Sequence, residues 1–66
     1  MDDEVLRQWE ELKTMVEILD VDVVKNASGN SSAGVRARKG LRELRTVVST
    51  LVKTTLSAEK AKAAEK

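Results

Sequence analysis

The sequence has 66 residues, of which 41% are hydrophobic and 35% charged, with one tryptophan and no cysteine, histidine, tyrosine or proline. A chain this short forms one small domain at most, because about 60 residues bury only about 60% of the surface exposed by the unfolded chain. Disulfides and thiolate metal sites are excluded, and most groups used in nucleophilic and acid–base catalysis are missing. We therefore expect no enzyme, no metal site, no cofactor and no small-molecule ligand.

The net charge of +1 hides an uneven distribution. Residues 1–25 carry eight acids and three bases, whereas residues 26–66 carry nine bases and three acids, so the two parts have net charges of −5 and +6. No apolar run approaches the roughly 20 residues of a membrane span. We expect a protein of the cytoplasm that does not bind membranes and has two parts of opposite charge.

Residues 3–25 are predicted to form a helix because apolar residues recur at alternating spacings of four and three, as in the seam of a heptad repeat. We expect Asp2 to cap this helix, since a carboxylate accepts hydrogen bonds from the free amides of a first turn. Trp9 is expected to pack in the seam and not to stack on nucleic-acid bases. The predicted seam consists of Val5, Trp9, Leu12, Val16, Leu19 and Val23.

Residues 26–32 interrupt this pattern and predict a turn, with Gly29 in a left-handed conformation and Ser31 or Ser32 capping the next helix. The alternation of four and three then resumes and predicts a second helix over about residues 33–62. Its end, residues 57–66, is expected to project beyond the first helix and to fray, because it offers little apolar surface. The second seam is Ala37, Leu41, Leu44, Val48, Leu51, Thr55 and Ala58.

The fold class predicted for the single domain 1–66 is all-α, a two-helix antiparallel hairpin, and such a hairpin has only one internal seam. Further apolar residues lie outside that seam and would remain exposed in a single copy. We therefore expect a homo-oligomeric helical bundle, most simply a dimeric four-helix bundle. These extra residues are Leu6, Met15, Ile18, Val21, Val24, Val47, Val52 and Leu56.

Basic residues concentrate at the start of the second helix, with five in ten positions. Arginine binds phosphate oxygens in bidentate fashion, and a helix N-terminus adds positive potential, so the backbone of double-stranded DNA is a fitting partner. The candidate DNA-binding residues are Arg36, Arg38, Lys39, Arg42 and Arg45.

The same bases have two other interpretations. They could form a solvated face, or pair with the acidic first helix, as charged residues do in helical bundles. In that case the chain would be a coiled-coil oligomerisation module that docks a protein and binds no nucleic acid. A peripheral membrane helix is disfavoured, because anionic lipid repels the acidic first segment. The available acids are Glu10, Glu11, Glu17 and Asp20.

Residues 29–44 resemble the hallmark segment of the small linker-histone-like nucleoid proteins of the chlamydial type. The resemblance implies a histone-like protein that compacts, bends or bridges duplex DNA without sequence preference, in the nucleoid or on a viral genome. It is carried by a Gly-Asn turn, small residues, an Arg-x-Arg-Lys cluster and a Leu-x-x-Leu seam. The matching positions are Gly29, Asn30, Ala33, Gly34, Arg36, Arg38, Lys39, Leu41 and Leu44.

The sequence departs from this pattern in three places. Chlamydial members continue into a long tail rich in Lys and Ala, whereas this sequence ends at Lys66, and Ser31 and Gly40 stand where a base and an alanine are expected. We expect these differences to lower the affinity for DNA and to leave the fold intact. Gly40 is expected to allow a close helix approach, at a cost of about 1 kcal/mol relative to alanine.

Overall fold

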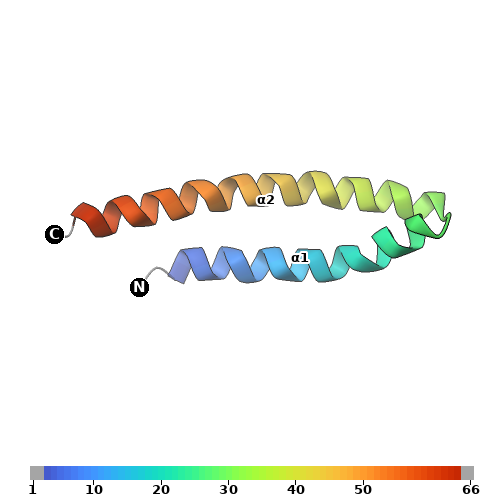
Figure 1. Ribbon diagram of the computed structural model, residues 1–66, viewed down its shortest axis with the longest axis horizontal. Helices are drawn as coiled ribbons and strands as arrows, with labels where there is room; N and C mark the ends of the chain where they lie inside the picture. Colours follow the sequence, from blue (N-terminus) through green and yellow to red (C-terminus); the bar gives the residue numbers. More distant parts are fainter. Residues whose placement is uncertain (1–2, 65–66) are drawn as a thin grey trace.

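The computed structural model describes residues 3–64 and consists of two helices. Helix α1 comprises Asp3–Ala27 and helix α2 comprises Ser31–Ala64. They lie side by side as an antiparallel hairpin measuring 55 × 15 × 11 Å (Figure 1). The predicted all-helical hairpin is confirmed, with helices that extend closer to the turn than expected. Asp2, the expected cap of the first helix, lies outside the described residues.

The turn consists of residues 28–30 and terminates α1 with a Schellman motif. The amide of Asn30 donates to the Lys25 carbonyl oxygen at 3.0 Å, and that of Gly29 to the Asn26 carbonyl oxygen at 2.9 Å. Gly29 has φ = 104°, which confirms the predicted left-handed residue.

The cap of α2 is Asn30 and not Ser31 or Ser32, so that prediction is wrong. The Oδ1 atom of Asn30 accepts a hydrogen bond from the Ala33 amide at 3.0 Å. Because Asn30 has left the α1 conformation while its carbonyl oxygen already accepts from the Gly34 amide, it occupies the N-cap position itself. One residue thus ends the turn and starts the second helix.

Small residues bring the two helices together near the turn. Ala33, Gly34 and Ala37 are buried, and together with Leu19 they form the small core of the hairpin. A Cβ atom built on Gly40 would lie 2.6 Å from Leu19 Cδ2, which confirms that this glycine permits a close approach. Near the turn, the hairpin therefore packs through small residues of α2 against Leu19 of α1.

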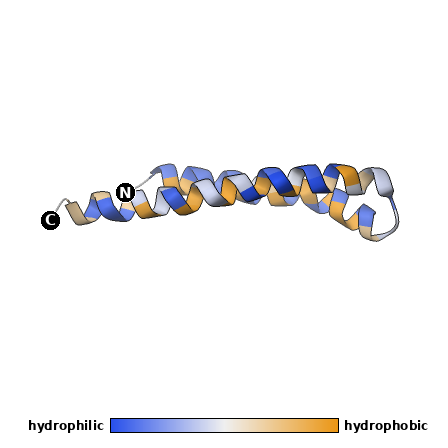
Figure 2. Cartoon of the chain, turned by 90° about the horizontal axis from the view of Figure 1, so that it is seen from above, coloured by the Kyte–Doolittle hydropathy of each residue, from blue (hydrophilic) through white to orange (hydrophobic). Residues whose placement is uncertain are grey.

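Each helix is rotated about its own axis relative to the prediction, so that different residues face the other helix. Val5, Leu12 and Leu19 face α2 as expected, but Trp9, at 46% exposure, does not. The predicted positions of both helices alternate between the seam and one exposed side, so the assignment of Trp9 to the seam is wrong for the hairpin. Figure 2 shows apolar positions (orange) recurring along both helices. The exposed members of the predicted seams are Trp9, Val16, Val23, Leu41 and Val48.

Helix α2 is longer than α1, with 34 residues against 25. It projects past the first residues of α1 at the open end of the hairpin (Figure 1). Val5 shares a surface groove with Ala58 and Lys62, so the projecting part is shorter than the predicted segment 57–66. None of the described helices is long and apolar enough to cross a membrane.

Candidate nucleic-acid interface

The predicted binding residues all lie in the first half of α2. The first turn of this helix contains no acidic residue, and its N-terminus therefore keeps the positive end of the helix dipole uncompensated by carboxylates of its own. All five predicted bases are exposed. The local electrostatics of this segment favour an anionic ligand.

Three arginines share one shallow surface groove. Arg38, Arg42 and Arg45 line it together with Leu41. Positions 38, 42 and 45 follow the i, i+4, i+7 pattern that places residues on one side of a helix. Arg38 and Arg45 are about 10 Å apart along the helix axis. The structure therefore brings these three predicted residues together, with Lys39 beside them on the outer surface of α2.

Arg36 has a different environment. Its Nε atom donates to Asp22 Oδ1 of α1 at 3.0 Å, in an ion pair that links the helices next to the turn. A guanidinium that already binds a carboxylate has fewer donors for phosphate. The structure thus separates Arg36 from the other four predicted bases.

The remaining four bases have no carboxylate partner within the described part of the chain. In residues 3–64, ion pairs with acidic side chains are made by Arg7, Lys13 and Arg36 only. The alternative in which the five predicted bases pair with the first helix of their own chain is therefore met at Arg36 alone. The four predicted binding residues without a carboxylate partner are Arg38, Lys39, Arg42 and Arg45, and we call them the basic cluster.

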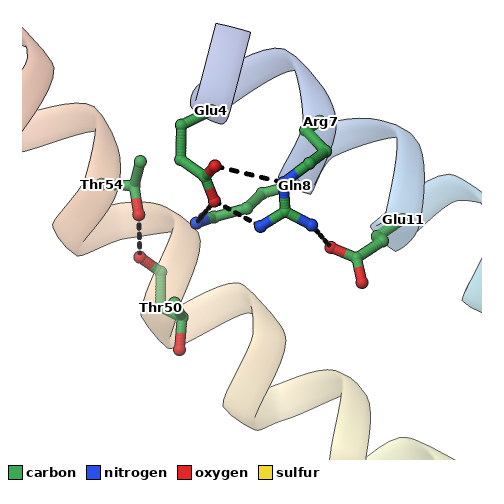
Figure 3. A network of polar contacts seen from close by, with 6 residues as sticks. All are labelled: Glu4, Arg7, Gln8, Glu11, Thr50 and Thr54. Carbon is green, nitrogen blue, oxygen red and sulfur yellow. Dashed lines mark hydrogen bonds and ion pairs between the residues drawn. The ribbon is translucent and has the colours of Figure 1, made fainter. Parts of the chain in front are cut away.

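Two of the three bases of α1, in contrast, are neutralised locally. Arg7 binds both Glu4 and Glu11, the latter at 2.9 Å, and Lys13 binds Glu10 at 2.9 Å (Figure 3 for Arg7). Hydrogen bonds from Arg7 and then Gln8 lower the pKa of Glu4 from 4.5 to about 2. Lys25, in the last turn, is exposed and has no carboxylate partner in the described residues, so α1 keeps one free base against the four of the basic cluster.

The outer surface of α2 is also free of acids over much of its length. Glu43 lines a groove with Leu19 and Gly40, and Glu59 lines a groove with Val5, so both described carboxylates of α2 lie toward α1. Lys53 follows Arg42 by eleven residues and Lys60 follows Lys53 by seven, which places both on the outward side of the helix. Lys53 was not among the predicted binding residues, although its spacing from Arg42 places it on the same side of the helix.

The described residues contain no group of three or more His, Cys, Asp or Glu side chains that could hold a metal ion. The surface grooves are open and shallow, and the arginine-lined one has no enclosed pocket in which a small substrate would be surrounded. The arrangement suits an extended anionic surface.

A family model described as histone H1-like protein Hc1 matches residues 7–62. No curated protein and no solved structure shows a significant match. The matched range includes most of α1, the turn, the basic cluster and most of α2, and it confirms the resemblance carried by residues 29–44. Because the match extends over well more than half of its residues, the chain belongs to the family of histone H1-like protein Hc1.

Proposed function

We propose that this chain is a histone-like protein that binds duplex DNA without sequence preference and compacts it through contacts to the phosphate backbone. The observation that carries the proposal is the basic cluster on α2, whose four bases have no carboxylate partner in the described residues. Membership in a histone H1-like family supports the same function.

The affinity arises from the release of counterions. Each phosphate neutralised by Lys or Arg frees condensed cations, so the logarithm of the binding constant falls with the logarithm of salt by about 0.9 per contact. We expect no contacts to the edges of the DNA bases, because the Arg and Lys side chains lie along one side of the helix without the Asn or Gln residues that commonly contact adenine. The protein therefore binds unrelated duplexes equally well.

A salt titration tests this mechanism. The double variant Lys39→Ala/Arg42→Ala should bind random duplex more weakly, and its salt slope should be lower by about 1.8, which corresponds to two lost phosphate contacts. Fluorescence anisotropy at several salt concentrations, on two duplexes of unrelated sequence, measures both quantities. An unchanged slope would remove the basic cluster from the mechanism.

The matched control removes the same charge from α1. Arg7→Ala/Lys13→Ala also deletes two bases, but carboxylates already neutralise them, so the slope should stay within error of the parent chain. The salt slope of Arg36→Ala should lie between those of the two double variants, because Asp22 already binds part of the Arg36 guanidinium. A loss of DNA affinity that is equal in the two double variants would indicate a mere effect of net charge.

The working form is proposed to be a homodimer. A single hairpin leaves large apolar side chains exposed on both helices and buries few residues between them. The alternative of a protein-interaction module without nucleic-acid binding rests on that same exposed surface. It becomes the better account if the titration shows no binding at micromolar protein and low salt.

A further inference from the structure

One broad side of the hairpin carries a continuous row of exposed apolar side chains. Trp9 and Val16 line one groove, and Val16, Val23 and Leu41 line the next, so residues from both helices share this side. Val48 follows Leu41 by two helical turns and extends the row. We call Trp9, Val16, Val23, Leu41 and Val48 the apolar face; each is between 43% and 50% exposed.

The opposite broad side is polar at both of its ends. It carries the group formed by Glu4, Arg7 and Glu11, and the ion pair between Arg36 and Asp22 (Figure 3 for the first). Ile18 is the large exposed hydrophobic residue in the groove on that side, where it neighbours Glu43. The apolar groove of this side is confined to the region around Met15 and Ile18, whereas the apolar face runs continuously from Trp9 to Val48.

The heptad positions of the sequence point toward the side that carries the apolar face. In α1 the row Val5, Trp9, Leu12, Val16, Leu19 and Val23 alternates between the seam and the apolar face. Its mean direction lies roughly midway between α2 and the exposed side, at 100° per residue. In a four-helix bundle, heptad residues point in this way toward the central axis, diagonal to the neighbouring helices.

The size of the face suits a second copy of the hairpin. The length shared by both helices is about 37 Å at 1.5 Å per residue, and the hairpin is 15 Å wide. Two such footprints total roughly 1,100 Å², which reaches the ~1,000 Å² that specific interfaces exceed.

Charge decides how the two copies are oriented. On the α1 margin, Asp20 and Glu17 line the same grooves as the apolar face, together with Lys13, whose charge Glu10 already neutralises. On the α2 margin, Arg38 and Arg45 flank Leu41. A two-fold axis parallel to the helices places each α1 against the other copy's α2, so acidic margins meet basic ones. A two-fold axis perpendicular to the helices places α1 on α1, where acid meets acid.

The positions of the charged residues along the helix axis agree with a two-fold axis parallel to the helices. Leu19 lies against Gly40, so residues whose numbers add up to about 60 lie at the same height in the hairpin. An axis parallel to the helices preserves height. Asp20 then lies within about 3 Å, along the axis, of Arg38 in the second copy, and Glu17 within about 3 Å of Arg45.

We infer that two copies pack through the apolar face as parallel hairpins, with both turns at one end and each α1 against the α2 of the other copy. The two α2 helices are then diagonal in the bundle, and their outward bases lie on opposite sides. If the proposed function holds, the dimer binds one duplex on each side and bridges two DNA segments. In this dimer Arg38 and Arg45 face carboxylates of the other copy, so Lys39 and Arg42 are the members of the basic cluster that remain for DNA. Lys53 and Lys60 extend this duplex-facing row along α2.

The orientation is tested by a distance between labels at the turn. The sequence has no cysteine, so Ser28→Cys accepts one spin label per chain. With both turns at one end, double electron–electron resonance should give a label separation below about 30 Å, since bundle helices are about 10 Å apart. With the turns at opposite ends the separation exceeds about 36 Å, because each turn lies some twelve residues from the middle of the face. The longer distance would overturn the arrangement.

A charge exchange tests the contact between the margins. Asp20→Arg and Arg38→Asp should each weaken the dimer about tenfold or more in sedimentation experiments, by placing like charges together. The double variant restores the opposite-charge pair and should recover most of the affinity. If the double variant is weaker than either single one, the two residues do not face each other.

A bridging experiment tests the arrangement of the dimer separately from the proposed DNA binding. An immobilised duplex should retain a second, labelled duplex in the presence of the parent protein, and Trp9→Ala should lose this retention while still binding a single duplex in anisotropy. Absence of any DNA binding would refute the proposed function and leave the label distance as an independent result. Binding without bridging, by a confirmed dimer, would overturn the opposite placement of the α2 helices.

Discussion

Asn30 connects the turn to the helix that carries the candidate binding residues. Its amide closes the end of α1 and its side chain caps the start of α2, while Asn26 Nδ2 donates to its carbonyl oxygen at 3.3 Å. Residues in this position satisfy amides that the helix cannot pair itself. One residue therefore fixes both the end of α1 and the start of α2.

Replacement of this cap should destabilise the hairpin. Asn30→Ala removes the acceptor for the Ala33 amide and should lower the free energy of unfolding by about 1 kcal/mol. Ser31→Ala and Ser32→Ala are the matched controls, and we expect changes within about 0.5 kcal/mol, as for ordinary surface positions. Urea unfolding followed by circular dichroism measures all three, and a larger effect at either serine would contradict the assignment of the cap.

At the scale of an element, the first turns of α1 are stabilised by charge. Asp3 and Glu4 lie at the positive end of the helix dipole, and Arg7 holds Glu4 from one turn further along. These side chains are substantially exposed, at 49% for Glu4 and 59% for Arg7. Their stabilising effect is therefore local and weakened by salt.

This arrangement predicts a loss of helix at acid pH. The pKa of Glu4 is lowered from 4.5 to about 2, so its ionised form stabilises the folded state above pH 4.5, and this contribution disappears as the pH falls toward 2. An NMR titration of the Glu4 carboxyl carbon should give the low value directly. In Arg7→Met, which removes the main cause, the pKa of Glu4 should return most of the way to 4.5. An unchanged low pKa would contradict the role of Arg7.

At the scale of the whole molecule, the proposed dimer bears on stability. The buried core of one hairpin contains Leu19, Ala33 and Ala37, which is small for independent stability. Binding of a second copy to the folded state stabilises it by mass action. Folding and association are therefore expected to be coupled.

The melting temperature should consequently rise with protein concentration. Val16→Ser, on the apolar face, should reduce this dependence and lower the melting temperature, because it removes apolar surface from the dimer. Ile18→Ser is the matched control on the polar side, and should leave the concentration dependence as in the parent chain. Calorimetry over a hundredfold range of concentration measures the effect. Equal behaviour of the two variants would exclude the apolar face as the interface.

The sequence by itself determined the two helices, the turn and the location of the basic cluster. Periodicity near 3.6, the Gly-Asn pair and the absence of proline are local signals, and they depend little on what the helices pack against. The resemblance of residues 29–44 also indicated the family, since this segment contains both the turn and the bases. Contacts between neighbours in sequence need no knowledge of the fold.

Only the tertiary structure decided the rotation of the helices and the separation of the bases. Apolar residues encircle much of each helix, so several stripes could form the seam, and the close approach at Gly34 and Gly40 selected the one that leaves Trp9 exposed. The pair between Arg36 and Asp22 joins residues 14 apart in sequence, and it exists only because the hairpin closes at this rotation. Which side chains remain free depends on packing between segments, and periodicity within one segment does not contain that information.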